Sequence, residues 1–194
     1  MVEHLRILSL IFFDSKLPWN FGTSNPKMAS SSTHGASSST SISPNYDVFL
    51  SFRGVDTRKN FTDYLYTTLV RYGIQTFGDD EELEKGGIIA SDLSRAIKES
   101  RIFMIIFSKN YAYSRWCLNE LVKITECARQ EGSMVLPIFY HVDPSDIRKQ
   151  SGIFGDALAH HERDADEKKK EMIQKWRTAL TEAASLSGWH VDDQ

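Results

Sequence analysis

The sequence predicts an α/β fold, a three-layer sandwich in which helices cover both faces of a parallel sheet. Apolar, β-branched runs alternate four times with helical patterns, and this alternation favours parallel strands joined by right-handed crossovers. Residues 101–108 and 134–140 are almost continuously apolar, as is typical of strands that are buried on both faces. Pro44 and Gly54 bound the first apolar run of the ordered region.

The ordered region begins with three predicted elements and a loop. Residues 46–52 are rich in aromatic and β-branched side chains and are expected to form the first strand. Residues 57–72 carry apolar side chains at helical spacing, and Gly73 follows them as a helix-ending residue. Residues 74–77 are expected to form a short second strand, which leads into an acidic, glycine-rich loop over 78–88.

The later elements follow from the same periodicities. They are expected in this order: helix 91–100 with Ser91 as its N-cap, strand 101–108, helix 114–130, strand 134–140, loop 141–152, helix 153–161 and helix 165–187. The lysines at 168–170 lie among acidic residues in the last helix, and we interpret them as a solvated face. The pattern does not indicate a fifth strand.

The N-terminal region has a different composition. Residues 28–45 are rich in Ser and Thr and can bury too little apolar surface to fold. We therefore expect residues 1–45 to be a disordered, Ser/Thr-rich extension and residues 46–190 to be the folded domain. The apolar stretch 5–13 is too short to span a bilayer and lacks the features of a signal peptide. Met28 is an alternative start, in which case residues 1–27 are not translated.

The composition narrows the class of protein. Of 194 residues, 41% are hydrophobic and 25% are charged, which suits one globular domain with a core. The formal net charge of −3 gives no support for a nucleic-acid or membrane partner. Cys117 and Cys127 lie in one predicted helix at a spacing that fits neither a local disulfide nor a CxxC metal site. A reduced, cytoplasmic location is therefore expected, with the nucleus as an alternative.

The binding site is expected beyond the carboxyl ends of the strands, where ligands bind in open parallel sheets. This rule selects four segments: 53–54, 79–80, 108–116 and 141–146. Trp116 and Glu120 follow the third strand and are four residues apart, so a helix places them on one face. Cys117, Leu121 and Thr125 take a neighbouring face that can pack inward.

Several common site patterns do not occur in the sequence. No GxGxxG follows the first strand, and no GxxxxGK[ST] occurs anywhere, so the usual phosphate-binding loops are missing. His160 and His161 lack partners at metal-ligand spacing and are interpreted as helix-end residues, and no metal site is expected. Asp79 and Asp80 fit either a phospho-accepting acid cluster or the acids of a solvent loop. The first interpretation would also need an Asp after residues 101–108, and none follows.

Five segments in order carry a resemblance to a known family: YDVFLSFRGVDTRKNF, GIQTFGDD, AIKESRIFMIIFSKNYAYSRWCLNEL, PIFYHVDPSDIRKQSGIFG and KWRTAL. Together they resemble a plant TIR domain, the N-terminal signalling part of many intracellular disease-resistance receptors. The resemblance extends over residues 46–190. It implies a flavodoxin-like sheet of five parallel strands, one strand more than the hydrophobic pattern indicates.

The resemblance implies an NAD⁺ or NADP⁺ nucleosidase that releases nicotinamide and forms ADP-ribose or cyclic ADP-ribose-type products. The family's catalytic carboxylate falls on Glu120. Cleavage builds positive charge on the ribose, which a nearby carboxylate stabilises. The implied substrate-binding residues are Phe52, Arg53, Gly54, Asp80, Ser114 and Trp116. Arg53 suits a phosphate, and Trp116 suits nicotinamide or ribose. NAD⁺ or NADP⁺ is a substrate here, and no permanently bound cofactor is implied.

The resemblance also implies self-association and contacts with other TIR domains. The loop over 78–90, called the BB loop, would reach toward a second protomer, and its residues include Glu84, Lys85, Gly86 and Gly87. Gly155 resembles an interface position at which a side chain would block close approach. Another interface usually carries a Ser-His pair, and this chain has Asp63-Tyr64 there instead.

Two functions from different classes follow from this sequence. One is the self-associating enzyme, and the other is a non-enzymatic adaptor that recruits other TIR domains. The sequence leaves open the choice between NAD⁺ and NADP⁺, the cyclic product and the pathogen signal. It is also consistent with an excised domain, a truncated receptor or a TIR-only protein.

Overall fold

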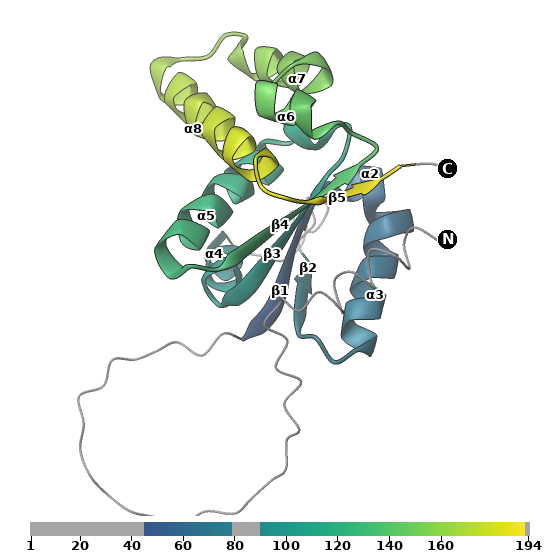
Figure 1. Ribbon diagram of the computed structural model, residues 1–194. Coiled ribbons are helices and arrows are strands. Elements are labelled where there is room, and N and C mark those ends of the chain that lie inside the picture. Colours follow the sequence, from purple (N-terminus) through teal and green to yellow (C-terminus); the bar gives the residue numbers. More distant parts are fainter. Residues whose placement is uncertain (1–44, 79–89, 193–194) are drawn as a thin grey trace, which may run out of the picture. The chain divides into compact units, whose positions relative to one another are not determined.

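The computed structural model describes residues 45–78 and 90–192, which contain a five-stranded parallel sheet flanked by helices (Figure 1). The strands are β1 (Tyr46–Phe52), β2 (Thr76–Gly78), β3 (Ser100–Phe107), β4 (Met134–Tyr140) and β5 (Trp189–Val191). They lie in the order β2-β1-β3-β4-β5, and every neighbouring pair is parallel. This order is the flavodoxin-like one, and it confirms the predicted fold class.

Helices lie on both sides of the sheet. In Figure 1, α3 (Asp63–Arg71) lies on one side, and α4 (Ala90–Lys98), α5 (Arg115–Glu131) and α8 (Glu167–Ala184) lie on the other. The direction of the crossovers requires this division. The connection from β1 to β2 runs opposite to the connections that lead to β3, β4 and β5, and right-handed crossovers then place the helices on opposite faces.

The larger part of the core lies between the sheet and the helices α4, α5 and α8. Alternate residues of β1, β3 and β4 point to this side, and each helix contributes its apolar stripe. The fully buried members include Phe49, Phe103, Ile105, Phe107, Ile97, Leu118, Leu121, Ile124, Ile173 and Leu180. Residues 102–107 are all buried, which confirms that β3 is covered on both faces.

Two helix starts differ from the sequence prediction. The helix expected at residue 57 begins earlier, with α2 (Gly54–Thr57), and continues through a π-helical turn, Arg58–Thr62, into α3. The carboxylate of Asp56 binds groups that follow β3, and these bonds hold the early turn in place. Ser91 is not an N-cap, because α4 already includes Ala90.

The loop predicted over 141–152 is wrong, since it contains α6 (Pro144–Lys149). The Asp143 carboxylate accepts a hydrogen bond from the Ser145 backbone N–H at 2.7 Å, and Pro144 occupies the first helical position, where it needs no hydrogen-bond partner. The next helix, α7 (Gly152–Glu162), ends with His160 and His161, which confirms that these are helix-end residues.

Some predictions concern residues outside the described ranges. They are the disordered extension, of which residues 1–44 are not described, and the loop residues Asp79, Asp80, Glu84, Lys85, Gly86 and Gly87. Their predicted roles stay predictions. Within the described ranges, no helix is both long enough and apolar enough to cross a membrane.

Candidate functional site

The candidate site lies where β1 and β3 end side by side at the middle of the sheet. The two strands are paired up to Phe52 and Ile106. The strand order reverses here, because β1 leads outward to β2 while β3 leads toward β4 and β5. Ligands of flavodoxin-like folds bind at this point. The segments that follow the two strands carry most of the predicted site residues that the structure describes.

Asp56 joins these two segments. Its Oδ1 accepts a hydrogen bond from Arg53 Nη1 at 2.7 Å, and its Oδ2 accepts one from Ser108 Oγ at 2.6 Å and one from the Asn110 backbone N–H at 3.0 Å. Burial alone would raise the pKa of Asp56, but the bonds from Ser108 and Asn110 and the charge of Arg53 outweigh it and lower the pKa. An ionised Asp56 therefore orients Arg53 at the edge of the sheet.

Tyr111 ties the start of α5 to β1. Its hydroxyl donates a hydrogen bond to the Cys117 carbonyl oxygen at 3.2 Å. The same hydroxyl lies 2.9 Å from Ser51 Oγ, and because its own proton is already used, Ser51 is the donor in this second bond. Burial raises the pKa of Tyr111 well above its usual value, and the charges of Cys117 and Glu120 add to this effect. The phenol therefore stays protonated and keeps its role as a donor. The Cys117 thiol also donates to the Phe52 carbonyl, at 3.5 Å.

Ser114 is the N-cap of α5. Its buried hydroxyl accepts a hydrogen bond from the Cys117 backbone N–H at 3.1 Å, which satisfies one of the free donors of the first turn. This bond is sufficient to explain a serine at this position. A role for Ser114 in substrate binding stays a prediction.

Trp116 and Glu120 lie on neighbouring turns of α5 and border the same groove. The groove has a volume of about 380 Å³ and also touches Leu93 and Met172. The Trp116 side chain is half-buried, whereas Glu120 is only 2% exposed. Cys117, Leu121 and Thr125 are buried, as expected for the inward face of the helix. A carboxylate with little access to water interacts strongly with a positive charge that develops beside it.

The other predicted substrate-binding residues that the structure describes lie at the end of β1. Phe52 is 6% exposed, and the guanidinium of Arg58 lies 5.8 Å from the centre of its ring. Gly54 is buried at the start of α2. The Arg53 side chain keeps 22% of its surface exposed beside Asp56, so it is accessible to a ligand.

The predicted interface residues that are described lie on helices beyond the candidate site. Asp63 and Tyr64 are exposed in the first turn of α3. Gly155 lies in α7, where an added Cβ would come within 2.6 Å of the Gln150 carbonyl oxygen. This glycine is therefore required by the packing of its own chain. Its role in an interface stays a prediction.

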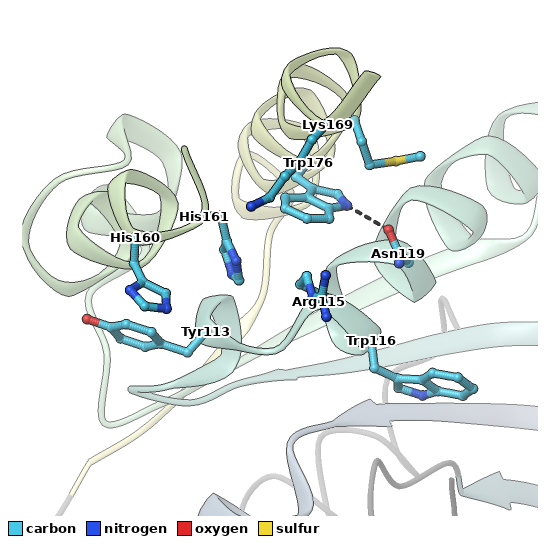
Figure 2. A pocket seen from close by; sticks show the side chains of 9 residues that line it. Tyr113, Arg115, Trp116, Asn119, His160, His161, Lys169 and Trp176 are labelled. Atoms are coloured by element: carbon cyan, nitrogen blue, oxygen red, sulfur yellow. Dashed lines mark hydrogen bonds between the residues drawn. The ribbon is translucent and has the colours of Figure 1, made fainter. Parts of the chain in front are cut away.

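A second hollow was not predicted from the sequence. It has a volume of about 660 Å³ and lies between the start of α5, the end of α7 and the first half of α8 (Figure 2). Lys169, from the lysine run at 168–170, borders it together with His160 and His161. Spacing along the chain gave no sign of this pocket, because its residues come from four separate helical segments: the 3-10 turn Tyr111–Tyr113, α5, α7 and α8. Among the described residues, no group of three His, Cys, Asp or Glu could hold a metal ion.

Comparison with known protein families decides the class of the chain. The family model described as "TIR domain" matches residues 45–194. The chain belongs to the TIR domain family. This result agrees with the strand order and with the placement of Trp116 and Glu120 after β3.

Similar TIR domains occur in plant disease-resistance proteins. The chain is 59% identical over 171 residues to disease resistance protein RPV1 of Vitis rotundifolia. This alignment covers 86% of the chain and 12% of RPV1. It is 54% identical over 153 residues to TMV resistance protein N of Nicotiana glutinosa. That alignment covers 79% of the chain and 13% of protein N. The chain therefore spans only a small part of the length of these relatives.

A solved structure supports the same fold. The TIR domains of the activated Roq1 resistosome, which directly recognises the pathogen effector XopQ, match with a TM-score of 0.68 and 48% identity. The match covers 75% of this chain and 87% of that chain.

Proposed function

We propose that this TIR domain acts in plant immune signalling as an NAD⁺ or NADP⁺ nucleosidase that becomes active when it self-associates. The similarity to plant disease-resistance proteins supports the signalling role. The observation that carries the enzymatic role is the buried Glu120, which borders one groove with Trp116 on the helix that follows β3. A cytoplasmic or nuclear location belongs to the same proposal.

The proposed reaction breaks the bond between nicotinamide and the ribose carbon. The bonding electrons leave with the nicotinamide nitrogen, which neutralises the positively charged pyridinium ring. Positive charge then spreads over the ribose carbon and ring oxygen, as in glycoside cleavage. Water bonds to this carbon and loses a proton, which gives ADP-ribose. If a nitrogen of the adenine bonds instead, the product is cyclic.

Each residue of the site has a role that suits its surroundings. The Glu120 carboxylate stabilises the positive ribose, because few water molecules compete for its charge. Trp116 offers an aromatic surface for nicotinamide or ribose. Arg53, oriented by Asp56 at 2.7 Å, is suited to a phosphate of the dinucleotide. Tyr111 and Ser114 position the helix that carries Trp116 and Glu120.

Self-association is part of the proposal. One relative of known structure is an activated resistosome, and its TIR domains are the part that matches this chain. The predicted residues for association are Asp63, Tyr64 and Gly155 and the loop residues 84–87. If assembly completes the site, activity rises more steeply than protein concentration, because the assembled fraction also rises.

The test is nicotinamide release from NAD⁺ and from NADP⁺ over a series of protein concentrations. Glu120→Gln keeps the shape of the side chain and removes its charge, so the fold is preserved while the stabilising charge is lost. We expect at least a hundredfold lower release, in line with the loss of one strong electrostatic contact to a transition state. Glu131→Gln is the matched control, because Glu131 is exposed at the end of the same helix.

The competing function is a non-enzymatic adaptor, and the same variants distinguish the two. A wild-type protein that self-associates but releases no nicotinamide at any concentration would favour the adaptor. Undiminished release by Glu120→Gln would instead show that another group supplies the charge. In plants, loss of signalling by Glu120→Gln with intact association supports the enzyme.

A further inference from the structure

The pocket between α5, α7 and α8 is a second place where a ligand could bind. Figure 2 shows the labelled side chains of α7 and α8 gathered around one hollow together with Tyr113 and Arg115, whereas the Trp116 ring points away from them. The nine residues that line it are Tyr113, Arg115, Trp116, Asn119, His160, His161, Lys169, Met172 and Trp176. Its volume of about 660 Å³ lies within the range of small-molecule pockets.

The charge of this pocket is positive and is not balanced locally. Arg115 and Lys169 border it, and none of the nine lining residues is acidic. In the part of the chain that the structure describes, neither side chain forms an ion pair. Neighbouring cations of α8 do have partners: Lys170 lies 2.8 Å from Glu167, and Arg177 lies 2.7 Å from Glu162. Two cations with no described counter-ion face a shared space in a chain with a net charge of −3.

His161 responds to this positive field. Burial lowers its pKa, and the nearby charges of His160, Arg115 and Lys169 lower it further, against the effect of its bond to the Ala112 carbonyl. That bond joins His161 Nε2 to the carbonyl oxygen at 2.9 Å, so Nε2 carries the proton. An anion in the pocket would reverse the repulsion that His161 experiences.

The pocket also has aromatic walls. Tyr113 is 37% exposed, His160 is exposed, and the centres of their rings are 6.1 Å apart. Trp176 forms a fixed part of the wall, because it is 2% exposed and its indole N–H donates to Asn119 Oδ1 at 2.9 Å. Exposed ring surfaces next to cations suit a ligand that has both a planar ring and a negative charge.

We propose that this pocket binds a small phosphorylated ligand with a planar ring, of the nucleoside monophosphate class. The phosphate would lie between Arg115 and Lys169, and the ring would pack against Tyr113 and His160. Arg115 provides a planar pair of donors for phosphate, and Lys169 adds a point charge. The pocket shares Trp116, Asn119 and Met172 with the groove that Glu120 borders. The contacts proposed here come from other residues, and they do not depend on the reaction proposed at Glu120.

The test is calorimetric titration of the full chain with AMP, adenosine and inorganic phosphate. We expect AMP to bind more tightly than either part alone, because only AMP has both the ring and the phosphate. Lys169→Gln should weaken AMP binding about tenfold, as expected for the loss of one charged contact. Lys170→Gln is the matched control, because it removes the same charge from the next residue, which is exposed and paired with Glu167.

A second readout locates the ligand. AMP, but not adenosine, should raise the pKa of His161 in an NMR titration, because the phosphate offsets the repulsion from Arg115 and Lys169. Arg115→Gln should reduce both this rise and the affinity. The proposal is overturned if AMP does not bind, if Lys169→Gln and Lys170→Gln bind it equally, or if inorganic phosphate binds as tightly as AMP.

Discussion

Asp56 connects the two loops on which the candidate site is built. Its carboxylate accepts hydrogen bonds from Ser108 and Asn110, and it forms an ion pair with Arg53. Its side chain is only 10% exposed. Charged hydrogen bonds in such a place contribute more than bonds at the surface, because water competes less for the carboxylate.

Asp56→Ala should therefore lower the free energy of unfolding by about 2 kcal/mol, since it leaves the buried hydroxyl of Ser108 and the part-buried donors of Asn110 without their acceptor. Urea denaturation measures this change. Asp156→Ala is the control, because Asp156 is exposed in α7, and its free energy of unfolding should stay close to that of the wild type. Equal stability of Asp56→Ala and the control would mean that the loops are held by other contacts.

The residues that could be predicted from the sequence are those with a local signal. Trp116 and Glu120 are related by helical spacing, and their position after β3 pointed to the switch point. Asp56 was missed because its partners Ser108 and Asn110 are 52 and 54 residues away. No periodicity connects such distant residues, and only the pairing of β1 with β3 brings them together.

At the scale of the elements, the corner between α6 and α7 depends on a close approach of two backbones. An added Cβ on Gly155 would lie 2.6 Å from the Gln150 carbonyl oxygen. This oxygen belongs to the backbone, so it cannot rotate away as the end of a side chain could. Gln150 is itself held, with φ 55 and a side chain that donates to the Arg177 carbonyl at 2.8 Å. The corner is therefore rigid on both sides.

Gly155→Ala should destabilise the domain by about 1–3 kcal/mol, as expected for an overpacked contact. The loss should appear in thermal denaturation at low protein concentration, where self-association contributes least to stability. Ala159→Gly serves as a helix control, since Ala159 is exposed in α7 and the change should cost about 1 kcal/mol through helix propensity alone. If Gly155→Ala changes only self-association and leaves the stability of the monomer unchanged, the glycine serves an interface and not this corner.

The elements that the sequence did not reveal are short. β5 has only three residues, Trp189–Val191, and it is recognisable by its pairing with β4. α6 has six residues, too few to show a helical apolar repeat. Its start signals, Asp143 followed by Pro144, lie within residues 141–152, which were expected to form a loop. Short elements depend on tertiary contacts, so their local patterns carry little information.

For the molecule as a whole, two titratable groups with little exposure, Asp56 and His161, link stability to pH. Hydrogen bonds and the charge of Arg53 outweigh the effect of burial and lower the pKa of Asp56, while burial lowers the pKa of His161. The Asp56 carboxylate stabilises the fold while it is ionised, and this contribution is lost as the pH falls below about 4. His161 also makes the domain less stable as the pH falls, but at a higher pH than Asp56 does. The reason is that His161 binds a proton more readily in the unfolded chain than in the folded chain.

The free energy of unfolding should therefore begin to decrease as the pH falls below about 6.5, the ordinary pKa of histidine. Above that value His161 is neutral in both states and causes no pH dependence. Below it, the unfolded state binds more protons than the native state, so stability decreases with decreasing pH until the lowered native pKa of His161 is passed. Urea denaturation at intervals between pH 8 and pH 5 measures this slope.

His161→Gln should flatten the slope, because glutamine can still donate to the Ala112 carbonyl but does not titrate. His160→Gln is the matched control, since His160 is the exposed neighbour on the same helix end, and most of the slope should remain. A slope that is equally steep in His161→Gln would assign the acid sensitivity of the domain to other groups. A slope that disappears in His161→Gln alone would show that one buried imidazole, beside the positive pocket, causes the pH dependence of the domain's stability near neutral pH.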